Sequence, residues 1–307
     1  MLINYTDHIN KLNDFRKGKV KEALKLGHKE IDSSFRFVAG NMNFILGHNN
    51  VGKTHFTFYL MLLYSLKHNI RWLVFSSEND PVQLIKKLIE FIEGKPINKI
   101  EDEDYEKAKD FVYNHFKFVD INRQYTYKQL LDLAEKLKEA WDYDGLLIDP
   151  INSLRKELKD TNGYEYNYVQ LTDIRIFCKK HNISTWICAH AVTEALRRKH
   201  SANHEYGGMT PPPTIGDSEG GAVNGNRCDD FLICHRYIAS PDAWMYTRLY
   251  VAKVKEMSLG YKPTSHESPI LFKSILNNVG FQVGGKNLIK YRTKKQLTID
   301  NTTKNSK

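Results

Sequence analysis

Short apolar runs alternate along this chain with longer segments in which apolar residues recur at helical spacing. The runs lie at residues 44–46, 71–76, 145–149 and 184–190. Continuous apolar runs of this kind are typical of strands that are buried on both faces of a parallel sheet. We therefore predict four buried strands at these positions.

Segments with helical spacing follow these runs, at residues 55–66, 82–92, 128–141 and 164–181. Such a pattern presents apolar side chains on one face, as a helix packed on a sheet requires. The alternation of strands and helices from residue 42 to residue 235 predicts one α/β domain. Its central sheet should be mostly parallel and flanked by helices.

The later part of the chain has a different pattern. Further strands are predicted at residues 230–234, 244–254 and 268–285, the later ones as antiparallel β elements. Residues 194–227 show no apolar periodicity and contain several glycines and prolines. So long a structureless connection inside a compact domain is usually functional or disordered.

We predict a core at residues 31–285 with a basic extension on each side. Residues 1–30 form a basic, moderately amphipathic helical stretch, which packs either on a neighbouring subunit as a linker arm or on its own core. Residues 286–307 hold seven basic side chains and one acid, Asp300. This composition predicts a flexible tail that either touches nucleic acid or is merely solvated.

Composition is ordinary for a globular protein, but the charge favours a polyanionic partner. Of the 307 residues, 41% are hydrophobic, and 45 basic against 36 acidic side chains give a net charge of +9. No apolar run approaches the ~20 residues of a membrane span, and the first residues lack the apolar core of a signal peptide. The four cysteines show no C-x-x-C spacing, so we expect reduced, mostly buried thiols in a cytoplasmic protein.

One stretch fits the phosphate-binding pattern G-x-x-x-x-G-K-S/T at every fixed position: Gly47-His48-Asn49-Asn50-Val51-Gly52-Lys53-Thr54. It joins a predicted strand to a predicted helix, so its backbone N–H groups and the helix dipole face one spot. We expect residues 47 and 49–54 to bind the phosphates of ATP, with Lys53 reaching the β- and γ-phosphates. The Thr54 hydroxyl would ligate Mg²⁺.

Three polar residues stand at or just past the ends of predicted strands, where α/β domains bind their ligands. Asp149 ends its strand and would hold Mg²⁺, directly or through water. Glu78 follows its strand and would orient or deprotonate the attacking water. His190 ends its strand and is either a γ-phosphate contact or a structural histidine.

Two groups of cations are candidates for contacts with other molecules. Arg197, Arg198 and Lys199 begin the long connection and form either a DNA-binding element or a solvated run of charge. Lys253 and Lys255 alternate on a predicted strand and so point to one face. They either reach the γ-phosphate of a neighbouring subunit or line a surface strand.

Taken in order, these motifs resemble the RecA-like motor domain of hexameric replicative DNA helicases, the DnaB and Twinkle type of superfamily four. The resemblance covers about residues 30–262. The segments that carry it are 47–54, 75–78, 147–150, 189–190, 216–218, 229–233 and 252–260. It implies a RecA-like P-loop NTPase core that uses ATP and Mg²⁺. It also implies a ring-shaped homo-oligomer, expected to be a hexamer, that moves along single-stranded DNA.

The resemblance further implies a role for each candidate residue. Glu78 becomes the catalytic base, Asp149 the Mg²⁺-associated acid and His190 the γ-phosphate sensor, with Lys53 on the phosphates. Residues 194–227 would hold DNA-binding loops that face the ring channel. Lys253 and Lys255 would contact the γ-phosphate bound by the neighbouring subunit, and the arm before residue 31 would be the linker helix.

Three departures from the family pattern bear on these roles. Lys255 stands where the family has an arginine finger; since lysine lacks the bidentate fork, trans-activation is expected to be weaker or supplied elsewhere, for instance by Arg248. Residues 220–226 are rich in Gly and Asn where the family carries Gln or Glu. No primase domain precedes the motor, so a primase or loader is expected to be a separate chain.

We therefore predict an ATP-dependent, ring-forming DNA helicase of a replication system. The alternative is a non-motor RecA-like DNA-binding ATPase, such as a recombinase-like filament former or a helicase-derived accessory protein. A weaker alternative is a nucleotide-switched module that binds other proteins.

Overall fold

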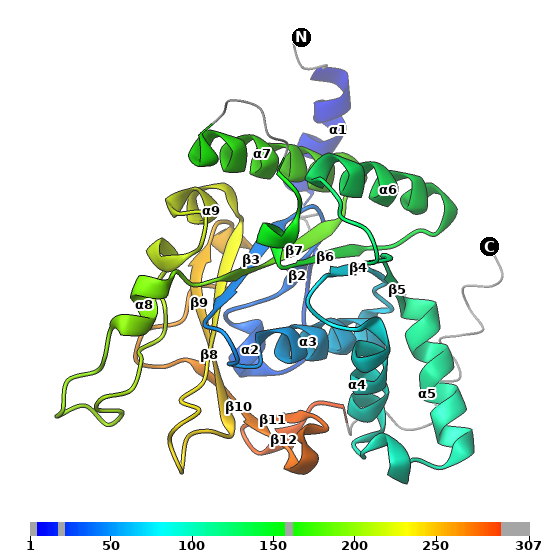
Figure 1. Cartoon of the computed structure of the whole chain (residues 1–307). Helices are drawn as coiled ribbons and strands as arrows, with labels where there is room; N and C mark the ends of the chain where they lie inside the picture. Colours follow the sequence, from blue (N-terminus) through cyan, green and yellow to red (C-terminus); the bar gives the residue numbers. More distant parts are fainter. Residues whose placement is uncertain (1–4, 18–21, 157–161, 290–307) are drawn as a thin grey trace.

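The computed structural model describes residues 5–17, 22–156 and 162–289, and ten strands of this part form one mixed sheet (Figure 1). The order across the sheet is β12-β11-β10-β9-β8-β3-β7-β6-β4-β5. The strands are β3 Met42–Gly47, β4 Trp72–Ser76, β5 Phe116–Phe118, β6 Gly145–Asp149, β7 Ser184–His190, β8 Asp230–His235, β9 Tyr246–Val254, β10 Ile270–Ser274, β11 Phe281–Val283 and β12 Lys286–Asn287.

The half of the sheet from β8 to β5 is parallel, and the half from β9 to β12 is antiparallel. The parallel register sets the strand ends level, because Gly47 pairs with His190 and Ser76 pairs with Asp149. The carboxyl ends of these strands therefore meet along one edge of the sheet. The predicted fold class, a mostly parallel central sheet flanked by helices with late antiparallel β elements, is confirmed.

Helices cover the parallel sheet in two layers (Figure 1). One layer contains α3 Lys53–His68, α4 Pro81–Glu93 and α5 Asp102–His115, and the other contains α6 Tyr127–Ala140, α7 Gly163–His181 and α9 Ala222–Arg227. The other helical segments described are α1 Tyr5–Arg16, α2 Lys29–Asp32, α8 Thr193–Arg197 and the 3-10 turns Ile97–Lys99, Ile151–Ser153, Ile215–Asp217, Met257–Leu259 and Leu276–Asn278. None of the helices in the described ranges is long and apolar enough to cross a lipid bilayer.

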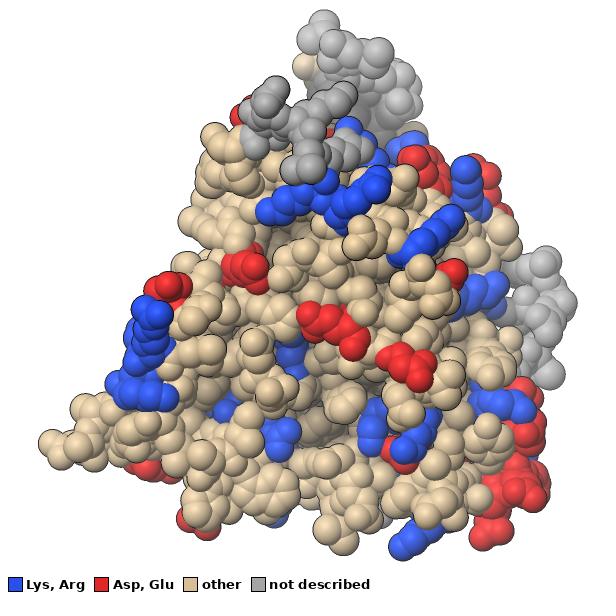
Figure 2. Space-filling view, viewed as in Figure 1, with Lys and Arg blue, Asp and Glu red and all other residues tan. Residues whose placement is uncertain are grey.

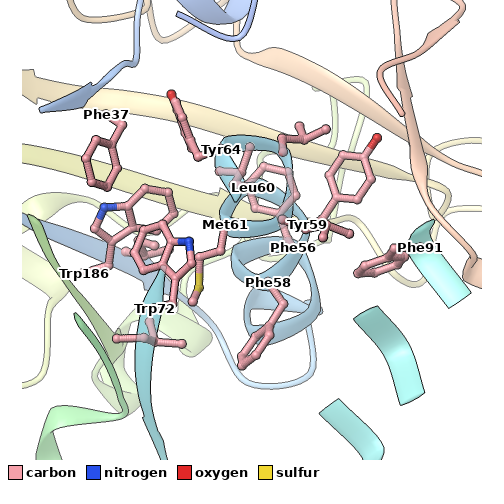
Figure 3. Packing of buried hydrophobic residues seen from close by; sticks show 14 of the residues in the cluster. Phe37, Phe56, Phe58, Tyr59, Leu60, Met61, Tyr64, Trp72, Phe91 and Trp186 are labelled. Atoms are coloured by element: carbon pink, nitrogen blue, oxygen red, sulfur yellow. The ribbon is translucent and has the colours of Figure 1, made fainter. Parts of the chain in front are cut away.

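Helix α3, which follows the phosphate loop, is buried along most of its length (Figure 3). Its Tyr64 ring packs against Phe37 and Trp186, and Trp186 meets Trp72 edge to face at 4.9 Å between ring centroids. Aromatic pairs of this kind each contribute about 0.5–1.5 kcal/mol beyond the burial of their area. The phosphate loop is therefore mounted on a rigid helix rather than on a mobile element. Cys178, Cys188, Cys228 and Cys234 are free and buried, as predicted.

The acidic and polar composition of residues 94–106 predicts a surface connection, and this prediction is wrong at its end, because α5 begins inside the segment at Asp102. Three acidic residues occupy the first turn, where they interact favourably with the helix dipole. The apolar face, which includes Ala108, Phe111 and Val112, begins only afterwards. The polar start of the helix therefore resembles a loop in sequence.

The prediction of one structureless connection over residues 194–227 is also wrong. The segment contains most of α8, a 3-10 turn at Ile215–Asp217 and all of α9. Helix α9 packs beside α7 and buries Val223. These helices are too short to show a helical period in sequence, and tertiary packing stabilises them instead.

The two ends of the chain differ from the predicted extensions. Helix α1 ends at Arg16, and the chain then forms β1 Ala23–Leu24, which pairs with β2 Phe37–Val38. The predicted helical stretch is therefore not continuous to residue 30. At the other end, β12 extends the sheet into the start of the predicted tail, and residues 290–307 lie outside the described part.

Candidate nucleotide-binding site

The phosphate loop turns from β3 into α3 through two residues with positive φ, Asn50 at 62° and Gly52 at 83°. Asparagine and glycine are the residues that adopt this conformation at low cost. Gly47 is needed for a different reason, since a Cβ there would lie 2.8 Å from the carbonyl oxygen of Cys234. The local sequence thus dictates the turn that presents the N-terminus of α3 at the sheet edge.

The side chain of Lys53 is buried beneath this loop, with 5% of its surface exposed. Its Nζ donates to the carbonyl oxygen of Ala189 at 2.8 Å and lies 3.3 Å from Nδ1 of His190. A buried ammonium group needs such partners, because leaving it unpaired would be expensive. Lys53 and His190, which are predicted site residues from different strands, are therefore in direct contact.

Thr54 and Asp149 are in direct contact next to Lys53. The Thr54 hydroxyl donates to Oδ2 of Asp149 at 2.9 Å, and the Ser76 hydroxyl lies 3.4 Å from the same oxygen. Asp149 is buried, which raises the pKa of its carboxyl group, while the nearby Lys53 charge acts in the opposite direction. Ser76 was not among the predicted site residues, although it ends β4 beside Asp149.

Glu78 lies at the rim of the site, where 52% of its side chain is exposed. Its Oε1 is 3.3 Å from Nε2 of His190, so His190 lies between Lys53 and Glu78. Predicted side chains from three strand ends and one helix N-terminus thus form two contacting sets, Lys53–His190–Glu78 and Thr54–Asp149, which are adjacent because Lys53 and Thr54 are neighbours in the chain.

Lys53, Thr54, Glu78 and His190 line a cleft of about 980 Å³, and Asp149 is buried next to it in contact with Thr54. The cleft is also lined by residues that were not among the predicted site residues: His55, Asn79, Thr193, Glu194, Glu219 and Arg236. Arg236 follows β8, and its Nε and Nη2 both donate to the carbonyl oxygen of Trp244, at 3.0 and 2.6 Å. Its Nη1 lies beside Gly52, 3.2 Å from where a Cβ would be. Its position after a parallel strand was the signal that could have identified it.

His48 ties the phosphate loop to the segment after α8. Its Nε2 is 3.1 Å from the carbonyl oxygen of Pro211, and its ring meets His235 edge to face at 5.9 Å. Burial lowers the pKa of His48, which favours the neutral ring. The phosphate loop is thus bonded directly to the region predicted to hold DNA-binding loops.

The chemistry of the cleft fits MgATP. A hydroxyl and a carboxylate, from Thr54 and Asp149, are the hard oxygen ligands that Mg²⁺ prefers. The described residues contain no group of three or more His, Cys, Asp or Glu side chains that could hold a metal alone. Mg²⁺ commonly takes only one or two protein ligands and completes its shell with phosphates and water. Thr54 and Asp149 would hold it here.

Lys253 and Lys255 lie at the opposite edge of the sheet. Lys253 pairs with Phe231 near the start of β8, and its Nζ donates to the carbonyl oxygens of Gly225 and Cys228 at 2.6 and 2.9 Å. Lys255 follows β9, with its Nζ 3.4 Å from Oδ1 of Asp229. A strand of five to six residues separates this edge from the phosphate loop by roughly 16 Å. Neither lysine reaches the phosphate loop of its own chain.

The cations of the long connection are exposed at one side of the molecule. Figure 2 shows Lys and Arg side chains gathered at the left of this face, where α8 lies in Figure 1. Arg198 pairs with Asp217, and Lys199 Nζ donates to the Thr210 hydroxyl at 3.0 Å. Within the described residues, Arg197 has no ion-pair partner. Arg248, the suggested substitute finger, is buried and donates to the Tyr206 hydroxyl.

No protein-family model matches this sequence. No curated protein matches it either. Solved structures do match. The ATPase domain of G40P gives a TM-score of 0.71 at 12% identity, over 92% of this chain and 99% of that domain. A DnaB-like replicative helicase, described with its interactions with primase, gives 0.67 at 12% identity, over 92% of this chain and 67% of that one.

The KaiC-like protein PH0186 from Pyrococcus horikoshii OT3 gives a TM-score of 0.55 at 15% identity, over 86% of this chain and 97% of that one. The chain therefore has a RecA-like ATPase fold. Its architecture is similar to that of the ATPase domain of G40P and of a DnaB-like replicative helicase, which confirms the predicted RecA-like fold.

Proposed function

We propose that this chain is an ATP-driven motor that forms a ring, expected to be a hexamer, and translocates on single-stranded DNA as a replicative helicase. The observation that carries the proposal is the set of contacts of Lys53 with His190, of His190 with Glu78 and of Thr54 with Asp149. These are the groups that phosphoryl transfer requires: a cation, an Mg²⁺ ligand pair and a carboxylate open to water.

Bound MgATP would supply the phosphoanhydride bond to be cleaved and a divalent charge beside Thr54 and Asp149. Lys53 balances negative charge on the phosphates from a buried position, where its interaction is little screened by water. Glu78 accepts the proton of the attacking water, which reaches it because half of its side chain is exposed. His190 holds the Glu78 carboxylate in place from the 3.3 Å contact.

In the proposed ring, Lys253 and Lys255 contact the phosphates bound by a neighbouring copy. Their place at the edge opposite the phosphate loop supports a head-to-tail arrangement, in which one edge of each copy meets the other edge of the next. The net charge of +9 and the exposed Arg197, Arg198 and Lys199 support a polyanionic partner, single-stranded DNA. A separate primase or loader is part of this proposal.

The first test measures ATP turnover and strand displacement with and without single-stranded DNA. DNA-stimulated turnover with displacement supports the helicase, whereas a chain that stays monomeric with ATP and DNA and displaces nothing refutes it.

The second test mixes two variants, Lys53→Ala and Lys255→Ala. Each is inactive alone, but in a mixed ring the intact phosphate loop of one meets the intact Lys255 of the other. Recovery of turnover on mixing supports sites shared between copies, and no recovery contradicts them.

A non-motor RecA-like ATPase is the second candidate. Lys253 is occupied by two backbone carbonyls and Lys255 faces Asp229 in its own chain, which favours weak activation between copies. Open filaments in electron micrographs, together with DNA-dependent turnover and no strand displacement, would favour this candidate.

A further inference from the structure

A second cleft, of about 720 Å³, lies between the segment after α8 and strands β8 to β10. It shares no lining residue with the cleft around the phosphate loop. Its size is within the roughly 300–1,000 Å³ of small-ligand sites. The proposed ATP hydrolysis makes no use of it.

Two stacks of flat rings line this cleft. Tyr206 stacks on Tyr237 with centroids 3.8 Å apart, and His200 stacks on His204 at 3.7 Å. The guanidinium of Arg248 lies 4.9 Å from the Tyr206 centroid and 4.7 Å from that of Tyr237. The described residues offer Arg248 no carboxylate within ion-pair distance. The cleft thus presents π-faces next to a guanidinium group that no described carboxylate contacts directly.

Hydrogen bonds fix the orientation of these rings. Arg248 Nη2 donates to the Tyr206 hydroxyl at 2.6 Å, and His200 Nε2 lies 2.9 Å from the Tyr237 hydroxyl. Tyr237 and Arg248 are buried, whereas Tyr206 is half-buried and His204 is exposed. The inner member of the tyrosine pair is therefore held by the core, and the outer rings are open to a ligand.

We propose that this cleft binds an unpaired nucleobase, which stacks against the Tyr206 ring or the His204 ring. Every nucleobase has a π-face and polar edges, so aromatic platforms of this kind accept bases with little regard to sequence. The carboxylates of Glu205 and Glu267, which also line the cleft, accept hydrogen bonds from base amino groups. Lys199, in the segment that forms the cleft wall, supplies positive charge for the attached phosphates.

The base would come from single-stranded DNA, and this part of the inference rests on the proposed function. The base of a free nucleoside would stack on the same rings even if the chain does not bind DNA. The two sources differ in the linked phosphates, which only the strand offers in series. An experiment that varies bases and phosphates separately therefore distinguishes them.

Binding is measured by fluorescence anisotropy with a labelled single strand of mixed bases and with an abasic strand that has the same number of phosphates, at one fixed salt concentration. The wild-type chain should bind the strand with bases roughly 5- to 150-fold more tightly. Tyr206→Leu keeps apolar volume but removes the ring, and it should weaken binding of that strand at least about fivefold while leaving the abasic strand unaffected. His204→Ala, at an exposed position, is the second variant, so a folding defect in the first leaves the test intact.

Tyr113→Leu is the matched control, because Tyr113 is 55% exposed on α5, at the far end of the sheet. It should bind both strands like the wild-type chain. Equal affinity of the wild-type chain for the two strands, or a base preference that survives in Tyr206→Leu and His204→Ala, would overturn the proposal. If the wild-type chain binds neither strand, the DNA-binding function fails. A titration with thymidine and adenosine then shows whether the cleft binds nucleobases. Tyr206-dependent nucleoside binding supports the site, and no binding overturns it.

Discussion

Replacing His235 with phenylalanine tests how strongly one buried imidazole limits the acid stability of this fold. His235 is 2% exposed at the end of β8, and neither ring nitrogen has a hydrogen-bond partner among the described residues. Its ring packs on Tyr237 at 4.6 Å and on His48 at 5.9 Å. His235→Phe keeps a ring of similar shape and removes both unpaired nitrogens.

The sign and size of the effect follow from the burial of His235. Burial, with the His48 charge second, lowers its pKa from 6.5 to about 3. Below pH 6.5 the unfolded chain therefore binds the proton more readily than the folded chain. The contribution of neutral His235 to the free energy of unfolding is complete above pH 6.5 and is lost as the pH falls toward 3. With about 1.4 kcal/mol per pH unit, the loss reaches about 2 kcal/mol at pH 5. His235→Phe should not lose this free energy of unfolding at pH 5.

The assay is urea unfolding followed by tryptophan fluorescence, at about pH 7.5 and about pH 5. The free energy of unfolding should fall by about 2 kcal/mol more in the wild-type chain than in His235→Phe. At the higher pH the variant should also be more stable by about 1 kcal/mol, since burying an unpaired polar group is unfavourable. His266→Phe, at an exposed histidine, is the control and should follow the wild-type chain. Equal losses in the wild-type chain and His235→Phe would refute the reasoning.

Three further predictions concern turnover. Lys53→Ala should lower ATP hydrolysis by roughly 10²-fold or more, because it removes the buried cation from the phosphates; turnover near the wild-type rate would contradict the phosphate-loop assignment. Glu78→Gln should keep the ATP affinity, measured by fluorescent-nucleotide titration, and lose roughly 10²- to 10⁴-fold in kcat. Loss of affinity instead would assign Glu78 to binding. Lys255→Arg should raise kcat in the assembled, DNA-bound state, because arginine contacts phosphate through a bidentate fork; no change in kcat would place Lys255 outside the site.

The parts of the fold that were predicted correctly have a strong signal within a few residues. Strands β6 and β7 were predicted at the bounds observed, since strands buried on both faces are continuous apolar runs. The phosphate loop was equally predictable, because backbone geometry requires its glycines and the charge of the phosphates requires Lys53. Helix α9, by contrast, has six residues and is stabilised by packing beside α7. No short stretch of the sequence indicates that contact.

The candidate site was predictable one residue at a time, but its connections were not. The sequence indicated that Lys53, Glu78 and His190 stand near strand ends. That His190 lies between the other two depends on the strand order β3-β7-β6-β4, which brings distant segments together. Arg236 was missed because its role depends on the turn after β8, where its guanidinium is aimed at Gly52 by the Trp244 carbonyl.

The separation of Lys253 and Lys255 from the phosphate loop has a consequence for counting sites. If a site is complete only where the two edges of different copies meet, a single chain has none. An open row of n copies then has n − 1 complete sites, while a closed ring of n copies has n. Turnover per chain would rise gradually with the length of a row but would reach its full value at once on ring closure. The dependence of ATP turnover on protein concentration therefore carries information about the shape of the assembly, before any image of it is taken.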